Sequence, residues 1–304
     1  MKAVSHVLVA TDLSPASRTA IDRGLAIATD NRARLSVLHA LELPTSGSLR
    51  EWLMDKSQPA SRFALLTNLA LESLEQICKE ARRDTDIQPA ILVAAERAET
   101  EIERMIAREH VDLVVVSALG AGARRPLLLG STTSRLLRTS SCPVLVTYAA
   151  DRRPYRRALI AVDFSPASLR SIELVREIAP DAEIHLLHVY EVPFEGKLRY
   201  AGVEESVLDT YKVDAREHAL RQLRALVALA GLDESAISLC AIHGHPVQSI
   251  LERRQSHACD LVVAGKHGTD VTAELLLGST TRRLLIEAEC DTLVVVDRER
   301  RTVT

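Results

Sequence analysis

Glycine, serine and threonine residues late in the chain have the spacing of a phosphate-binding loop. The tetrapeptide GKHG at 265–268 follows a short apolar run, and the tripeptide GST at 278–280 comes after nine intervening residues. Glycine lets the backbone approach a phosphate closely, and the free amides at a helix N-terminus attract anions. The spacing therefore predicts a loop and helix start that can hold a polyphosphate. Its key residues are Gly265, His267, Gly268, Gly278, Ser279 and Thr280.

A carboxylate precedes this loop by about a hundred residues in the chain. Asp163 ends an apolar run and stands just before Ser165 and Pro166. In an open α/β sheet, ligands bind at the carboxyl ends of strands, where a carboxylate can accept hydrogen bonds from a ribose hydroxyl or a base amine. Aspartate is also typical of Asx turns and helix caps. Taken alone, Asp163 leaves both interpretations open.

The chain repeats itself, and the repeat contains both features. Four segments of the first half recur in the same order in the second half, at shifts of 148 to 151 residues. Such a repeat indicates a duplicated domain, so we predict one domain at 1–150 and a second at 151–304. The matched pairs are 7–17 with 159–168, 33–44 with 182–193, 112–120 with 260–268, and 127–137 with 275–285.

Short apolar runs alternate with amphipathic segments in both halves. This alternation predicts a parallel sheet covered by helices on both faces. Ser14 and Pro15 suit the N-cap and first position of the first helix, and a loop is expected over 194–205. The expected strands lie near 7–10, 35–39, 90–95, 112–117 and 144–147, and near 158–162, 184–189, 237–242, 261–264 and 293–296.

Composition excludes several classes of protein. The formal net charge of −3 does not suggest a nucleic-acid-binding protein, which is usually basic. Apolar runs such as 113–116 are far shorter than a membrane-spanning helix. The five widely spaced cysteines are typical of a reduced, cytoplasmic protein. Nucleophile-elbow, zinc-protease and Walker A motifs are absent from the sequence, and so is the Rossmann dinucleotide fingerprint.

The spacing G-x2-G-x9-G-S/T resembles the ATP-binding signature of universal stress proteins. The opening strand that ends in Asp then Ser-Pro, the CPVLV run at 142–146 and the GHP element at 244–246 resemble that family too. The resemblance covers nearly the whole chain in two copies. It implies two tandem adenine-nucleotide-hydrolase-like (Rossmann-like) domains, each a five-stranded parallel sheet between helices, that bind ATP, accompanied by Mg²⁺. By resemblance, adenine and ribose would contact Ala161, Val162, Asp163, Val189, Gly265 and Gly268, and the phosphates Gly278, Ser279 and Thr280.

The first half departs from this pattern at one position. Ser117 stands where the family has the first glycine, and Leu119 replaces the polar His267. If close backbone approach is required, the serine side chain crowds the nucleotide, so we expect ATP mainly in the second domain. The matching residues that remain are Asp12, Gly120, Gly130, Ser131 and Thr132.

The resemblance favours a cytoplasmic, homodimeric regulator or sensor that responds to stress through bound ATP. No catalytic residue and no metal site is assigned: His243 and His245 lie two apart, whereas zinc needs three or four ligands. Two alternatives remain open. One is a scaffold, or a binder of an apolar molecule, that kept the fold without the nucleotide; the other is a slow ATPase. Neither a nucleic acid nor a membrane is expected as a partner.

Overall fold

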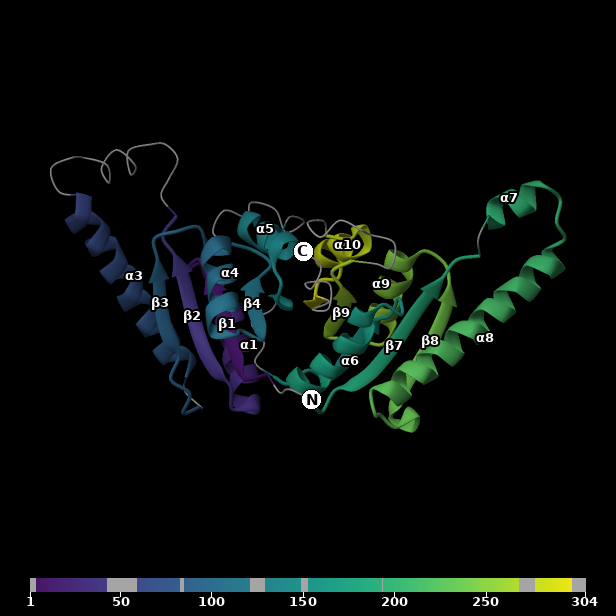
Figure 1. Cartoon of the computed structure of the whole chain (residues 1–304), viewed down its shortest axis with the longest axis horizontal. Helices are drawn as coiled ribbons and strands as arrows, with labels where there is room; N and C mark the ends of the chain where they lie inside the picture. The colour runs from purple at the N-terminus through teal and green to yellow at the C-terminus, as the bar shows by residue number, and fades with distance from the viewer. Residues whose placement is uncertain are drawn as a thin grey trace. The chain divides into compact units, whose positions relative to one another are not determined.

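The computed structural model of the chain describes residues 4–42, 59–82, 85–120, 129–148, 153–192, 194–267 and 277–296. The chain divides into two compact units, Met1–Arg153 and Pro154–Thr304. Within each unit strands and helices alternate (Figure 1), as the periodicity of the sequence predicts.

The first unit holds five described strands and four described helices. They are β1 (His6–Thr11), α1 (Arg18–Asn31), β2 (Arg34–Ala40), α3 (Pro59–Ala81), β3 (Ala90–Ala94), α4 (Ala98–Glu109), β4 (Leu113–Ser117), α5 (Ser131–Thr139) and β5 (Val144–Thr147).

The second unit repeats this order and adds two short helices. Its elements are β6 (Arg157–Ala161), α6 (Pro166–Ile178), β7 (Glu183–Tyr190), α7 (Glu195–Tyr200), α8 (Glu205–Leu229), the 3₁₀ turn η1 (Glu234–Ala236), β8 (Ile237–His243), α9 (Pro246–Ser256), β9 (Leu261–Gly265), α10 (Ser279–Glu287) and β10 (Asp291–Val295).

The sheet of each unit is parallel and follows the same order. In the first unit the order is β3-β2-β1-β4-β5, and in the second it is β8-β7-β6-β9-β10. The predicted five-stranded parallel sheets are thus confirmed. Strand order reverses between β1 and β4, and again between β6 and β9. Ligands of open α/β sheets bind beyond the carboxyl ends of the strands at such a reversal.

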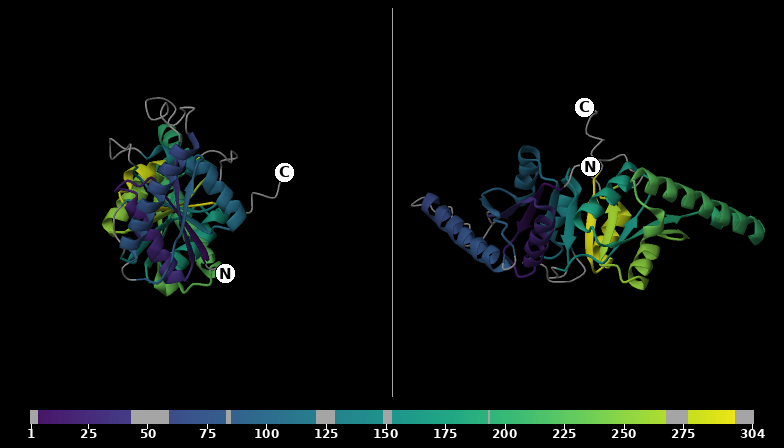
Figure 2. Two further views of the ribbon diagram at one scale, coloured as in Figure 1. Left: turned by 90° about the vertical axis from the view of Figure 1, so that its left-hand side faces the viewer. Right: turned by 90° about the horizontal axis from the view of Figure 1, so that it is seen from below.

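Helices cover both faces of each sheet (Figure 2). In the first unit α1 packs on β1 and contacts α3, while α4 packs against α5. The central strands are consequently buried on both sides, and all five residues of β4 are buried. Continuous apolar runs such as the LVV of β4 are the expected signature of such strands.

The start of the first helix differs from its prediction. Ser165 and Pro166 do occupy the N-cap and first positions of α6, but α1 begins only at Arg18 with Ser17 at the N-cap. Before it, Ser17 donates from its amide to the Ser14 hydroxyl at 3.2 Å and from its hydroxyl to the Ser14 carbonyl at 2.9 Å. Such local side-chain bonds compete with helix formation, so the sequence repeat hides a local difference between the units.

Two other features complete the fold. The expected loop 194–205 contains α7, a six-residue helix, so the loop prediction was wrong there. None of the described helices is long and apolar enough to cross a membrane.

Candidate functional site

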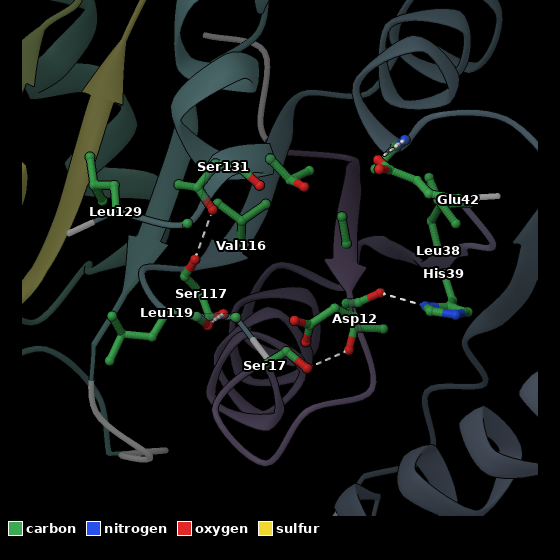
Figure 3. Close-up of a pocket in the computed structure, with 18 of the residues that line it drawn as sticks. Asp12, Ser17, Leu38, His39, Glu42, Val116, Ser117, Leu119, Leu129 and Ser131 are labelled. Carbon is green, nitrogen blue, oxygen red and sulfur yellow. Dashed lines mark hydrogen bonds between the residues drawn. The ribbon is translucent and has the colours of Figure 1, made fainter. Parts of the chain in front are cut away.

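A cleft of about 830 Å³ opens in the first unit where β1, β2 and β4 end (Figure 3). This volume falls in the range of small-molecule sites. Its position is the strand-order reversal that the fold predicts as a ligand site. All five site residues predicted for this unit line the cleft: Asp12, Gly120, Gly130, Ser131 and Thr132.

Asp12 faces the loop that follows β4. Its Oδ1 accepts a hydrogen bond from the Ser14 amide at 3.0 Å, which is an Asx turn. Gly120 lies against the other carboxylate oxygen, because a Cβ built on Gly120 would stand 2.7 Å from Asp12 Oδ2. Asp12 therefore closes a turn and also lines the cleft, while hydrogen bonding to a ribose stays a prediction.

Two hydrogen bonds tie the start of α5 to the loop after β4. The Thr133 hydroxyl donates to the Ser117 carbonyl at 3.0 Å, and the Gly130 amide donates to the Ala118 carbonyl at 3.0 Å. Gly130 is the N-cap of α5, the cap has no side-chain hydrogen bond, and the first turn has no acidic residue. Amides at such a helix start can bind an anion.

Ser117, the departure from the family pattern, turns its side chain onto its own loop. Its hydroxyl donates to the carbonyl of Leu119, and the residue is buried. The hydroxyl is therefore already engaged within the protein. Whether the extra atoms exclude a nucleotide stays a prediction.

The second unit repeats these two tethers at a shift of 148 residues. The Thr281 hydroxyl donates to the Gly265 carbonyl at 2.7 Å, and the Gly278 amide donates to the Lys266 carbonyl at 2.9 Å. Gly278 is the N-cap of α10, which opens with Ser279 and Thr280 and has no side-chain cap. Gly268, also predicted for this site, lies outside the described residues.

Gly265 shows why this position favours glycine. A Cβ built there would lie 3.2 Å from the carbonyl oxygen of His267 and 3.5 Å from the Cβ of Ala167. The first distance is shorter than most Cβ contacts in proteins, so a side chain at this position would displace the loop. His267 follows directly in that loop.

Asp163 uses one carboxylate oxygen for local structure. Oδ1 accepts from the Ser165 amide at 3.0 Å and from the hydroxyls of Ser165 and Ser168 at 2.6 and 3.0 Å. Oδ2 accepts no hydrogen bond from the described part of the chain. The turn-forming interpretation holds for Oδ1, while Oδ2 stays available to a ligand donor.

The remaining predicted residues lie at neighbouring strand ends. Ala161 ends β6 beside Leu187 of β7, and Val189 of β7 pairs with Ile242 of β8. Val162 follows Ala161 and accepts a hydrogen bond from His188 Nδ1 at 2.7 Å. In the first unit His39 Nδ1 makes the same bond to the Thr11 carbonyl at 2.9 Å. Because a carbonyl only accepts, both histidines carry their proton on Nδ1 in these bonds.

Sequence reasoning missed several cleft residues. Ser17 and Thr133 line the cleft, and both recur in the second half, so the repeat could have revealed them. Glu42 also lines it; its Oε1 is 3.4 Å from the Ala98 amide and 3.7 Å from Arg135. These two partners come from elements distant in the sequence, and no local motif predicts them.

The histidine pair of the second unit has a structural partner. His243 Nε2 lies 2.8 Å from Glu195 Oε2 on α7, so a carboxylate of the protein already contacts it. Among the described residues, no group of three or more histidine, cysteine, aspartate or glutamate side chains could hold a metal ion.

Comparison with known proteins gives a consistent result. The sequence profile of the universal stress protein family matches residues 4–147 and again 154–296. A universal stress protein of Mycobacterium tuberculosis is 26% identical over 97% of both chains. One of Methanocaldococcus jannaschii is 31% identical over 46% of this chain and 82% of its own length. A crystal structure of a universal stress protein from Archaeoglobus fulgidus, 19% identical, has the same fold with a TM-score of 0.68 over 97% of this chain and 99% of that one.

Proposed function

The chain belongs to the universal stress protein family, and we propose that it is a regulator or sensor of the stress response that binds ATP in its second unit. The hydrogen-bonded glycine loop and helix start support this proposal most directly. In both units the end of the fourth strand of the sheet, the glycine loop and the start of the following helix are joined by the same two hydrogen bonds. Uncapped helix amides at that point suit phosphate.

The second unit is favoured because Gly265 leaves the loop without a side chain at the point of closest approach. Asp163 Oδ2 would accept from the ribose, with Ala161, Val162 and Val189 against the base at the strand ends. Gly265 and Gly268 would lie near the sugar, and His267 beside them. Gly278, Ser279 and Thr280 would bind the phosphates through amides and hydroxyls.

Mg²⁺ would enter with the nucleotide. This ion keeps several waters and binds through phosphate oxygens and at most one or two carboxylates. The second unit offers oxygen ligands suitable for it, which are the Ser279 and Thr280 hydroxyls at the start of α10 and the Asp163 carboxylate beyond β6. When bound, the ion would neutralise part of the phosphate charge.

A cytoplasmic location and a homodimer belong to the same proposal. The five cysteines are all free thiols, which agrees with a reducing compartment. Light scattering on the purified chain measures the oligomeric state, and a monomeric mass at micromolar concentration would remove the homodimer from the proposal.

The nucleotide content of the purified chain tests the proposed ligand. After denaturation, released ATP or ADP should be close to equimolar with the chain, and a doubled amount would mean that Ser117 is tolerated. Absence of nucleotide, together with no binding at millimolar ATP and Mg²⁺, would refute the ATP proposal and favour a scaffold. Turnover above background that disappears on changing one cleft residue would instead favour an ATPase.

A matched pair of substitutions identifies the unit that binds. Gly265→Ser introduces the serine that the first unit already accommodates, so the fold should persist. The added atoms crowd the His267 carbonyl, and we expect ATP affinity to fall about tenfold, or about 1.4 kcal/mol. Ser117→Gly should leave this affinity unchanged or add a second site. Equal losses from both variants in calorimetry would argue against a preference for the second unit.

A further inference from the structure

A buried histidine lies near the start of β7, at the opposite end of this strand from the proposed nucleotide site. His185 on β7 is only 4% exposed, and neither ring nitrogen has a hydrogen-bond partner in the described structure. Glu183 Oε1 comes within 3.2 Å of Nε2, at ion-pair distance but without hydrogen-bond geometry. A buried polar group without such a bond is costly, so this site needs a physical explanation.

The surroundings of His185 are mainly basic. The ring of His257, which follows α9, meets it edge-on with centroids 5.1 Å apart. Arg157 of β6 and Arg253 of α9 add two positive charges, and the buried Nε of Arg253 is also without a partner in the described structure. The neighbour from β8 in the strand register is the uncharged Ser238.

The available negative charge is small and shared. The Glu183 side chain is 54% exposed and pairs with Arg157 Nε at 3.3 Å as well. Asp260, the next carboxylate, accepts from the backbone amides of Arg156 and Arg157. The nearby Cys259 thiol stays protonated, because burial raises its pKa to about 11. A proton on His185 would therefore create a buried cation with little compensation.

These charges determine whether the folded chain favours the neutral or the protonated form of His185. Burial lowers the pKa of His185; the charge of Glu183 opposes this, and His257, Arg253 and Arg157 add to the lowering. In the unfolded chain the imidazole regains its ordinary pKa. Between the two values the unfolded chain binds more protons, so stability decreases as the pH falls through the ordinary value toward the lowered one.

The first unit contains a buried histidine on a different strand, and both of its ring nitrogens have hydrogen-bond partners. His6 on β1 is equally buried, but its Nε2 lies 2.9 Å from the Ser36 hydroxyl and its Nδ1 lies 3.2 Å from the Glu109 carbonyl. Ser36 occupies the position in β2 that His185 occupies in β7. Burial lowers the pKa of His6 as well, but both oxygens can accept from an imidazolium, so a proton on His6 would keep two hydrogen bonds and cost less than one on His185.

We propose that His185 is a proton switch that loosens the packing of α9 on β7 in acid, more strongly than His6 loosens the first unit. Helix α9 lies beside β7 (Figure 1) and also contacts α10. A cation at His185 would repel Arg253 and His257 at the C-terminal end of α9. The switch does not depend on the nucleotide, so it can be tested whether or not ATP binds.

Hydrogen exchange of the full chain between pH 5 and 8, corrected for intrinsic rates, tests this switch. Peptides from β7 and α9 should lose protection below about pH 6.5, with an opening constant that rises by up to about tenfold per pH unit. Peptides from β1 and α4 should lose less protection than these over the same range. His185→Gln should abolish the pH dependence in the second unit, whereas His6→Gln should leave it in place.

A second variant keeps the proposal testable if His185→Gln does not fold. Glu183→Gln removes the carboxylate that opposes the lowering of the His185 pKa, so a proton on His185 should cost more. Protection of β7 and α9 should then fall further in acid, and the first unit should behave as in the wild type. If His185→Gln folds and retains the wild-type pH dependence, or if both units loosen to the same extent, the switch is refuted. An acid response that is unchanged in Glu183→Gln would refute it as well.

Discussion

Asp12 and Gly120 are in close contact in the first unit. The Asp12 carboxylate is fixed on one side by the Ser14 amide, and its other oxygen lies where a Gly120 side chain would begin. A glycine in such a loop is therefore explained by the carboxylate next to it. The phosphate-loop spacing predicts the glycine, but it does not predict this neighbour.

Replacing Gly120 by alanine tests that coupling without any ligand. The new Cβ would stand 2.7 Å from Asp12 Oδ2, so we expect a loss of about 1 kcal/mol in the free energy of unfolding. In an Asp12→Ala background the same change should cost less than about 0.5 kcal/mol, because the clashing atom is gone. Urea unfolding of the four proteins measures both values, and equal costs in the two backgrounds would exclude the contact.

At the residue scale, the sequence predicted which residues meet but not how their side chains are oriented. The repeat and the spacing located Asp12, Gly120 and Gly130 in one cleft, because chain order and strand ends determine that much. They could not show that the Ser117 hydroxyl bonds to Leu119, since its rotamer depends on the folded loop. Glu42 was missed for a similar reason, because it follows β2, whereas the predicted residues follow β1 and β4.

At the scale of elements, one glycine sets the distance between α1 and β1. A Cβ on Gly24 would lie 2.3 Å from the Cγ2 of Val9, in the middle of the buried strand. The matching position in α6 is Val175, which is fully buried. The two units therefore pack their first helices differently, although both helices occupy the same place in the fold.

Gly24→Ala should consequently be one of the most damaging small substitutions in the first unit. Moving α1 away from β1 to relieve the clash would cost about 2 to 3 kcal/mol of unfolding free energy. Gly196→Ala in α7 is the control, because its Cβ meets nothing within 4 Å and alanine favours a helix by about 1 kcal/mol. Thermal unfolding compares the two variants; a Gly24→Ala protein as stable as wild type would show that α1 can shift freely.

Strands were predicted better than helix starts, and the reason is physical. Burial on both faces makes a strand visible as a continuous apolar run, and each expected strand lies within two residues of its observed bounds. Helix α1 starts late because Ser17 makes three local hydrogen bonds: its hydroxyl bonds to the Thr11 hydroxyl at 2.6 Å and to the Ser14 carbonyl at 2.9 Å, and its amide donates to the Ser14 hydroxyl at 3.2 Å. Helix α7 was missed because its ion pairs, such as His243 with Glu195, join distant segments.

At the scale of the whole molecule, the two units share their strand order and loop hydrogen bonds but differ in their buried polar groups. The strand order and the loop tethers are the same in both units. The polar groups inside differ, since Ser36, which is hydrogen-bonded to His6 in the first unit, is replaced in the second by His185, whose ring nitrogens have no hydrogen-bond partner in the described structure. Divergence at such positions gives the two halves different responses to one solution condition.

The thiols of the chain provide a final test that spans both units. Burial raises the pKa of Cys78 and of Cys259 to about 11, and that of Cys290 to about 12. At pH 8 only about one molecule in a thousand would carry a thiolate at the first two positions, and the thiolate is the reactive form. Cys240 on the edge strand β8 is only partly buried.

A disulfide exchange reagent at pH 8 should therefore label Cys240 first in the native chain. Cys78, Cys259 and Cys290 should react at least about a hundredfold more slowly, at a rate limited by opening of the fold. Cys240→Ser should remove the fast phase, and denaturant should expose all of the remaining thiols at once. Fast labelling of Cys290 in the native chain would mean that the second unit opens far more readily than its packing implies, because that thiol is 9% exposed within its core cluster.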